Sequence, residues 1–134
     1  MFHEKALRIA MEAASDPALA PPPPDFSGRW VNQIQSSMDL TIAGDEVTGS
    51  YTSASSSGGG PVSGPIRGYV AGDRISFVVL WPKGSMTAWV GQMVDDDTSP
   101  KIKTLWHLVS DIPEADEPQR LWLSTLAGAD EFHR

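Results

Sequence analysis

Five tryptophans, and the polar side chains that recur beside them, are the residues of this chain with the clearest capacity for chemistry. The tryptophans are spread along the sequence, as Trp30, Trp81, Trp89, Trp106 and Trp122. Burial preference alone predicts that each is an ordinary core residue. Tryptophans that share a face with hydroxyl and carboxylate groups would instead form a pocket, with apolar walls and a few placed hydrogen-bonding groups.

Strand periodicity decides which of these side chains share a face, because residues of equal parity point the same way. In the segment SMTAWVGQ (85–92), Ser85 and Thr87 fall on the face of Trp89. In TLWHL (104–108), Trp106 shares a face with Thr104. Two more sets of equal parity carry polar groups, namely Gly49, Tyr51 and Ser53, and Leu126, Gly128, Asp130 and Phe132.

These polar companions allow two interpretations. A packed interior would not select them, because each buried hydroxyl or carboxylate costs free energy unless it is hydrogen-bonded. Inward-facing tryptophans would then indicate a ligand pocket. Alternatively, the polar residues face solvent and the tryptophans sit at a mixed interface. Alternation alone leaves both interpretations open.

The elements that must position these residues are short strands separated by turn signals. We expect them after Asp25, over residues 28–33, 40–43, 46–53, 65–70, 74–81, 85–94, 101–110 and 121–132. Gly44-Asp45 and Ala71-Gly72-Asp73 are the clearest turns between them. Eight consecutive strands with short loops predict an all-β fold, an eight-stranded antiparallel up-and-down barrel that holds at most one small ligand.

The N-terminal segment differs from the rest. Residues 2–15 are rich in helix-forming residues, with apolar residues at helical spacing, and predict a helix. Asp16-Pro17 should end it, because the residue before a proline avoids the α region, and Pro21–Pro24 form a stiff spacer. The chain is therefore expected to divide into an N-terminal helical extension with its proline-rich spacer, residues 1–24, and a barrel, residues 25–134.

Composition excludes several classes of function. The net charge of −7 argues against nucleic acid as a partner. The chain has no cysteine, which removes disulfides, thiolate catalysis and sulfur-ligated zinc. No apolar run approaches the roughly 20 residues that span a bilayer, so no membrane partner is expected. Charges at Lys5, Arg8 and Glu12 interrupt the N-terminal apolar stretch, which is not a clear signal peptide.

From about Asp25 to its end, the chain resembles the avidin and streptavidin family. The matching segments, in the family's order, are GRWVNQ (28–33), TGSYTS (48–53), FVVLW (77–81), TAWVGQ (87–92), TLWHL (104–108) and WLSTLAGADEF (122–132). The resemblance implies an avidin-like barrel that binds biotin with high affinity, sequesters it and catalyses nothing. It also implies a homo-oligomer, with a tetramer favoured over a dimer, and a secreted or periplasmic protein.

The resemblance also assigns roles by position. Asn32, Ser36 and Tyr51 match the donors to the ureido oxygen of biotin, while Asp130 and Ser53 match the acceptors for its two N–H groups. The ring sulfur would contact Thr87, and the valerate carboxylate would contact Ser85 and Ser57. The apolar walls would be Trp81, Trp89 and Trp106, and Trp122 matches a tryptophan that enters a neighbouring subunit's site. Biotin is then a ligand, with no cofactor and no metal, and Trp30 packs at the closed end.

Several features depart from the family pattern. Gln35 stands where the family usually has glycine. The loop between Trp81 and Ser85 is short, whereas the segment between Trp106 and Trp122 is long and contains two prolines. Residues 1–24 have no counterpart.

Three alternatives remain. A lipocalin-like carrier of another small hydrophobic ligand would keep the barrel but would not need the polar set. A barrel-shaped protease inhibitor would act through its rim or N-terminal arm. An enzyme would depend on one of the histidines beside Asp130 or a serine, yet no nucleophile elbow, metal spacing or phosphate loop is present. The histidines are His3, His107 and His133.

Overall fold

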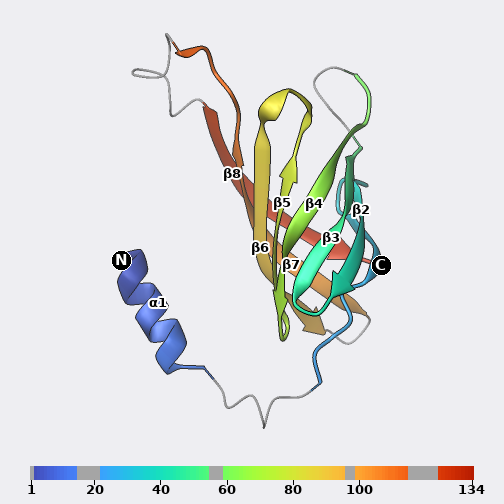
Figure 1. Cartoon of the computed structure of the whole chain (residues 1–134). Helices are drawn as coiled ribbons and strands as arrows, with labels where there is room; N and C mark the ends of the chain where they lie inside the picture. The colour runs from blue at the N-terminus through green and yellow to red at the C-terminus, as the bar shows by residue number, and fades with distance from the viewer. Residues whose placement is uncertain (1, 15–21, 55–58, 96–98, 115–123) are drawn as a thin grey trace.

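Eight antiparallel strands form a closed barrel, in which each strand pairs with the next in the chain and the last returns to the first (Figure 1). The computed structural model describes residues 2–14, 22–54, 59–95, 99–114 and 124–134. The strands are β1 Gly28–Asn32, β2 Ser37–Ala43, β3 Glu46–Ser53, β4 Val62–Ala71, β5 Arg74–Leu80, β6 Met86–Asp95, β7 Pro100–Val109 and β8 Thr125–His133. The predicted up-and-down barrel is confirmed.

Tight turns set the register of the barrel. Gly44 and Gly72, with φ of 63° and 61°, occupy the left-handed region inside the β2–β3 and β4–β5 turns, as glycine does without steric cost. A short 3₁₀ turn, η2 Pro82–Gly84, joins β5 to β6. The last strand begins at Thr125, because Ser124 belongs to a 3₁₀ turn, and residues 121–123 of the predicted strand lie outside the described residues.

One end of the barrel is closed by packing. Trp30 is completely buried, and its indole N–H donates to the Phe26 carbonyl at 2.8 Å. The Arg134 guanidinium covers the Trp30 ring at 4.1 Å from its centroid. Phe26 lies next to Ile42 and Val70, near the β2–β3 and β4–β5 turns. Trp30 is therefore a packed core residue, as predicted.

The middle of the barrel is filled by side chains from every second residue of each strand, which face inward. Large buried side chains come from every strand, among them Met38, Val47, Ile66, Ile75, Phe77, Met93, Ile102 and Phe132. Burying each of these contributes about 1.5–3 kcal/mol relative to exposure. Beyond this apolar middle, the interior also holds buried polar side chains, among them Asn32, Ser36 and Thr87.

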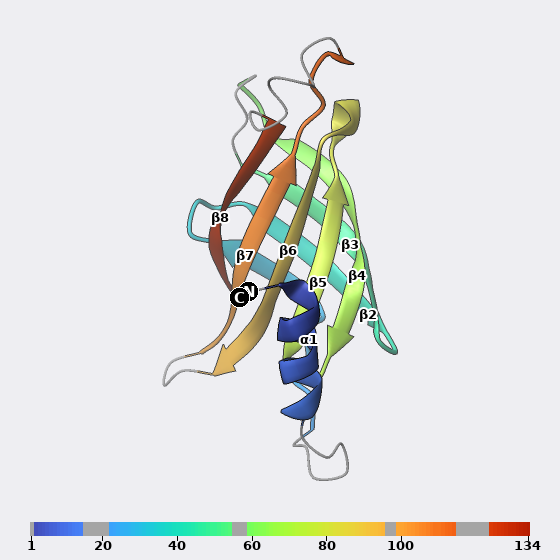
Figure 2. The ribbon, with the colours of Figure 1, turned by 90° about the vertical axis from the view of Figure 1, so that its left-hand side faces the viewer.

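The N-terminal helix, α1 His3–Glu12, is shorter than the predicted span of 2–15, and all its side chains are exposed. The predicted break at Asp16-Pro17 lies outside the described residues. Figure 2 shows β5, β6 and β7 side by side on one wall of the barrel. Within the described ranges, no helix has the length and apolar character needed to cross a membrane.

The turn between β1 and β2 contains a residue in a costly conformation, and this leads to a stability prediction. Gln35 has a φ of 68°, and its N–H donates to the Asn32 carbonyl at 3.1 Å. A left-handed conformation costs a non-glycine residue about 1–2 kcal/mol, partly offset in a glycine variant by greater unfolded-state entropy. Gln35→Gly should therefore raise the free energy of unfolding by about 0.5–1 kcal/mol, measured by urea denaturation.

The matched control is Gly44→Ala, at a φ of 63° where an added Cβ would meet no atom within 4 Å. It should lower the free energy of unfolding by about 1 kcal/mol. A destabilised Gln35→Gly variant would show that the glutamine side chain contributes more than its backbone costs.

Candidate ligand-binding site

A buried polar cluster lies where β1 ends, around Asn32, Ser36 and Tyr51. The Asn32 Oδ1 accepts from the backbone N–H groups of Ser36 at 2.9 Å and Ile34 at 3.1 Å. These bonds fix the orientation of the amide, so its Nδ2 faces the Tyr51 hydroxyl at 3.2 Å. The Ser36 Oγ accepts from the Ala54 N–H at 3.0 Å. The β1–β2 turn therefore brings an amide and two hydroxyl groups together.

The Tyr51 phenol is held in its neutral form. Burial raises the pKa of this phenol far above its usual value, and the negative charge of Asp130 raises it further. A hydrogen bond with the Ser36 side chain acts in the opposite direction but does not reverse the shift. Tyr51 is consequently a hydrogen-bond donor at every physiological pH.

Asp130, on β8, supplies a carboxylate beside this cluster. Its Oδ2 accepts from the Trp89 indole N–H at 2.9 Å, and its Oδ1 accepts from the Gln33 Nε2 at 2.9 Å. A carboxylate offers about four acceptor positions, so these two bonds leave capacity for a ligand N–H. Thr104 donates to the Asp130 carbonyl at 3.0 Å and fixes the backbone at this point.

Aromatic side chains surround the polar cluster. Tyr51 stacks on Trp89 at 4.9 Å between ring centroids, and Phe77 stacks on Trp89 at 5.0 Å. Trp81 meets the Tyr51 ring edge-on at 5.6 Å, and its indole N–H donates to the Thr87 hydroxyl at 2.8 Å. Such ring pairs contribute about 0.5–1.5 kcal/mol beyond area burial, so these contacts stabilise the wall.

Trp106 depends on a small residue opposite it. It lies half-buried on β7, paired in register with Gly128 of β8. A Cβ built at Gly128 would collide with the Trp106 ring. The glycine therefore leaves room for the indole to lie across the inner face. Leu126, which has the same parity as Asp130 on β8 and pairs in register with Leu108, remains exposed.

The structure brings most of the predicted site residues to one end of the barrel. Ser53 and Ser85 are half-buried there, at the end of β3 and just before β6. Ser57 and Trp122 lie outside the described residues, so their assignments stay predictions. The remaining predicted residues, described above, are Asn32, Ser36, Tyr51, Trp81, Thr87, Trp89, Trp106 and Asp130.

Sequence reasoning missed two residues of this arrangement. Gln33, an exposed residue, donates a hydrogen bond to the Asp130 carboxylate, and Phe77 stacks on the Trp89 ring. The signal for Gln33 was present, because it directly follows Asn32 in the matching segment GRWVNQ. Strand alternation places the Gln33 side chain on the outer face, so it did not predict this role. The backbone bends after Asn32, and the Gln33 amide therefore reaches β8.

Nothing in the described residues resembles a catalytic or metal centre. His3, His107 and His133 are all exposed, and Asp130 bonds to Trp89 and Gln33 rather than to an imidazole. Among the same residues, no group of three His, Cys, Asp or Glu side chains is placed to hold a metal ion.

A closed eight-stranded barrel with polar groups and aromatic walls gathered at one end defines a small-molecule binding protein. The Avidin family model matches residues 21–134, and the chain belongs to the Avidin family.

Solved structures agree with this assignment. Xenavidin is 27% identical with a TM-score of 0.69, over 82% of this chain and 96% of that chain. Apo shwanavidin is 30% identical with a TM-score of 0.61, over 80% and 97%. Rhizavidin, solved as a complex with biotin, is 24% identical with a TM-score of 0.64, over 81% and 90%, and shows the same fold. No significant match was found among curated proteins.

The neutral state of Tyr51 leads to a prediction about alkaline pH. A Tyr69→Phe variant leaves Tyr51 as the single tyrosine of the two in the chain. Because burial raises the folded-state pKa of Tyr51, the folded chain keeps its proton above about pH 10, where the unfolded chain loses it. The stability that this group contributes is thus fully present below about pH 10 and falls as the pH rises further.

We expect phenolate absorbance in this variant to appear only together with loss of the folded circular dichroism spectrum. Reversible ionisation near pH 10, with the fold intact, would contradict the buried environment of Tyr51.

Proposed function

We propose that this protein binds biotin without catalysis, in the open half of its barrel. The observation that supports this most directly is that Asn32, Ser36 and Tyr51 lie together, with the Asp130 carboxylate bonded to Trp89, the ring that stacks on Tyr51. The ureido group of biotin combines one carbonyl with two N–H groups. Three converging donors and a neighbouring acceptor are complementary to it.

Each group has a defined part in this proposal. Asn32, Ser36 and Tyr51 donate to the ureido oxygen, Asp130 and Ser53 accept from the ureido N–H groups, and Thr87 lies against the ring sulfur. Ser85 and Ser57 meet the valerate carboxylate. Trp81, Trp89 and Trp106 form the walls, and Trp122 enters from a neighbouring subunit.

Preorganisation is the physical reason for expecting tight binding. The Asn32 amide and the Asp130 carboxylate are already held by neighbouring groups, and Tyr51 is already neutral. A ligand that meets groups held in place loses little affinity to reorganisation. Bonds to a carboxylate are also stronger than neutral ones. We further propose that the protein sequesters biotin outside the cytoplasm.

The alternative function, lipocalin-like carriage of another hydrophobic ligand, is less well matched. A purely apolar ligand would make no use of the Asn32, Ser36 and Tyr51 donors or of the remaining acceptor capacity of the Asp130 carboxylate, which already bonds to Gln33 and Trp89. The polar cluster at the end of β1 thus favours a ligand with both a carbonyl and N–H groups.

Calorimetric titration with biotin tests the function. We expect one biotin per chain, and Asp130→Ala should weaken binding by about 1–3 kcal/mol or more, a rise in Kd of at least about 5- to 150-fold. Asp39→Ala is the matched control, because Asp39 is an exposed carboxylate on β2 in a surface ion pair with Arg29. The control should bind as the parent does.

Thermal unfolding with and without biotin serves as a second measurement, because a ligand of the folded state stabilises it. If biotin gives neither heat nor thermal stabilisation with the parent chain, the proposed function is wrong and the lipocalin-like carrier becomes the leading alternative.

We also propose that the protein is a homo-oligomer, with a tetramer favoured over a dimer. One outer wall of the barrel, named here the outer patch, is apolar without being covered. Val90 on β6 and Leu105 on β7 pair in register and are 63% and 70% exposed. The patch is completed by Val78, Leu80, Met86 and Val109. Contiguous exposed apolar surface of this kind marks an interaction site.

A charge in the middle of the outer patch should disrupt this assembly. Leu105→Glu would place a carboxylate between Val90 and Ala129, where an interface would desolvate it. Light scattering should then give a mass near the 14.4 kDa of one chain. Thr41→Glu, on the exposed face of β2, is the control and should keep the parent's mass. A monomeric parent chain would contradict the proposal.

A further inference from the structure

A histidine, His107, lies in the middle of the outer patch. On β7 it stands between two residues of the patch, Leu105 and Val109, because alternate residues of a strand share a face. Its partners in register are Ala88 on β6 and Ala127 on β8. The imidazole is exposed, and these four neighbours are uncharged.

The diagonal neighbours of His107 are uncharged as well. On β6 they are Met86 and Val90, both members of the outer patch. On β8 they are Thr125 and Ala129. The strand residues that adjoin the imidazole are thus apolar apart from one hydroxyl group.

Charged side chains begin one step further out. Toward the closed end of the barrel, Lys103 on β7 pairs in register with Glu131 on β8. The Glu131 carboxylate also lies 3.5 Å from the Lys101 ammonium, so its charge is already balanced by cations. At the far edge of the patch, Arg67 on β4 pairs in register with Val78. Two of these flanking groups, Lys103 and Arg67, are therefore positive.

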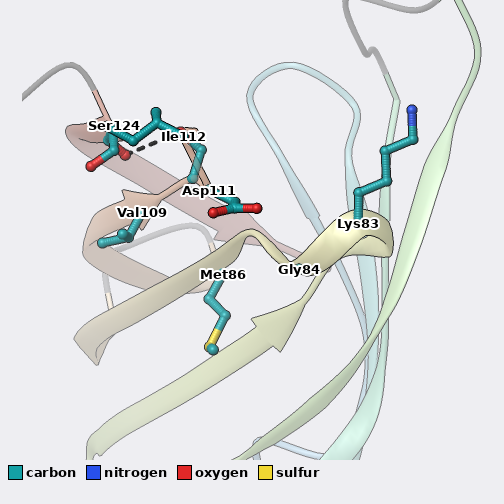
Figure 3. A pocket seen from close by; sticks show the side chains of 8 residues that line it. Lys83, Gly84, Met86, Val109, Asp111, Ile112 and Ser124 are labelled. Carbon is teal, nitrogen blue, oxygen red and sulfur yellow. Dashed lines mark hydrogen bonds between the residues drawn. The ribbon is translucent and has the colours of Figure 1, made fainter. Parts of the chain in front are cut away.

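The opposite edge of the patch carries one charge of each sign. Beyond Met86 and Val109, Lys83 projects from the η2 turn and Asp111 from the segment that follows β7 (Figure 3). Both border the outer wall beyond these two apolar residues rather than the centre of the patch. The carboxylates nearest to His107 thus lie at the edges of the patch, where cations accompany them.

A self-association through this wall would bury the imidazole. A two-fold interface brings the same surface of both copies together, so residues of the same apolar patch would face His107. A neutral imidazole is buried there at much lower cost than an imidazolium, which would lose its hydration without a countercharge. Imidazole is the side chain that ordinarily changes charge between about pH 5 and 8.

We propose that His107 makes the self-association of this chain dependent on pH, with assembly through the outer patch at neutral pH and dissociation in mildly acidic solution. The free chain takes up a proton that the assembled chain excludes. The free energy of assembly is therefore fully present where imidazole is neutral and falls as the pH decreases. The inference rests on the homo-oligomer proposed above and names the condition under which it comes apart.

The dissociation constant of the assembly, measured at two pH values, tests the inference. Fluorescence-detected sedimentation of the full chain over a dilution series would give this constant at about pH 7.5 and about pH 5.5, a range in which imidazole titrates while carboxylates stay mostly ionised. Complete exclusion of the proton should raise the constant about tenfold for each chain, or about 100-fold for two chains that meet at the patch.

Two substitutions at the same position separate the effect of charge from that of size. His107→Gln cannot gain a proton, and its dissociation constant should be the same at both pH values. His107→Lys is charged at both, and its constant should be raised at neutral pH as acid raises that of the parent. His133→Gln is the matched control, because His133 is exposed at the end of β8 and lies outside the patch. It should keep the pH response of the parent.

Two outcomes would overturn this inference alone. One is an assembled parent chain with equal dissociation constants at the two pH values, and the other is a pH response that persists in His107→Gln. A parent chain that is monomeric at neutral pH would overturn the proposed homo-oligomer as well. Titration with biotin at neutral pH tests the binding function separately from both.

Discussion

The seam between β1 and β8 is the constraint on which the rest of the barrel depends. Only two residue pairs join these strands in register, Val31 with His133 and Asn32 with Phe132. Gln33 extends the seam through its side chain, because its Oε1 accepts from the Glu131 N–H at 3.0 Å and its Nε2 donates to the Ala129 carbonyl at 3.4 Å. A side-chain amide thus continues the ladder where the backbone turns away. The same Nε2 donates to Asp130, so barrel closure and the orientation of the site carboxylate are coupled.

Arg134 strengthens the seam on its other side. Its guanidinium donates to the carbonyls of Ser27 at 2.8 Å and Asp25 at 2.7 Å, and it also covers the Trp30 ring. The segment that precedes β1 is thereby fastened to the residue that follows β8. The short backbone ladder is flanked by side-chain hydrogen bonds at both ends, and the polar groups of the site lie next to a fixed rather than a frayed edge.

Most of the fold could be predicted from the sequence, because turns and alternation are local properties. Gly44-Asp45 marked the β2–β3 turn correctly, and the parity of Thr87 and Trp89 placed both in the interior. The support of Asp130 by Gln33 could not be predicted in this way. It depends on where the chain bends after Asn32 and on which β8 residues lie opposite, and both are consequences of closure rather than of local pattern.

At Gln35, the backbone conformation that the site needs is one that a glutamine residue disfavours. Asn32 and Ser36 must lie close enough for the Asn32 Oδ1 to accept the Ser36 N–H, and a left-handed residue between them permits this. Glycine would adopt that conformation without steric cost, whereas the glutamine is held in it by the surrounding hydrogen bonds. The turn keeps the geometry that the two donors need although its sequence disfavours it. The hydrogen bonds of Gln33, one residue after Asn32, fasten the start of this turn to β8.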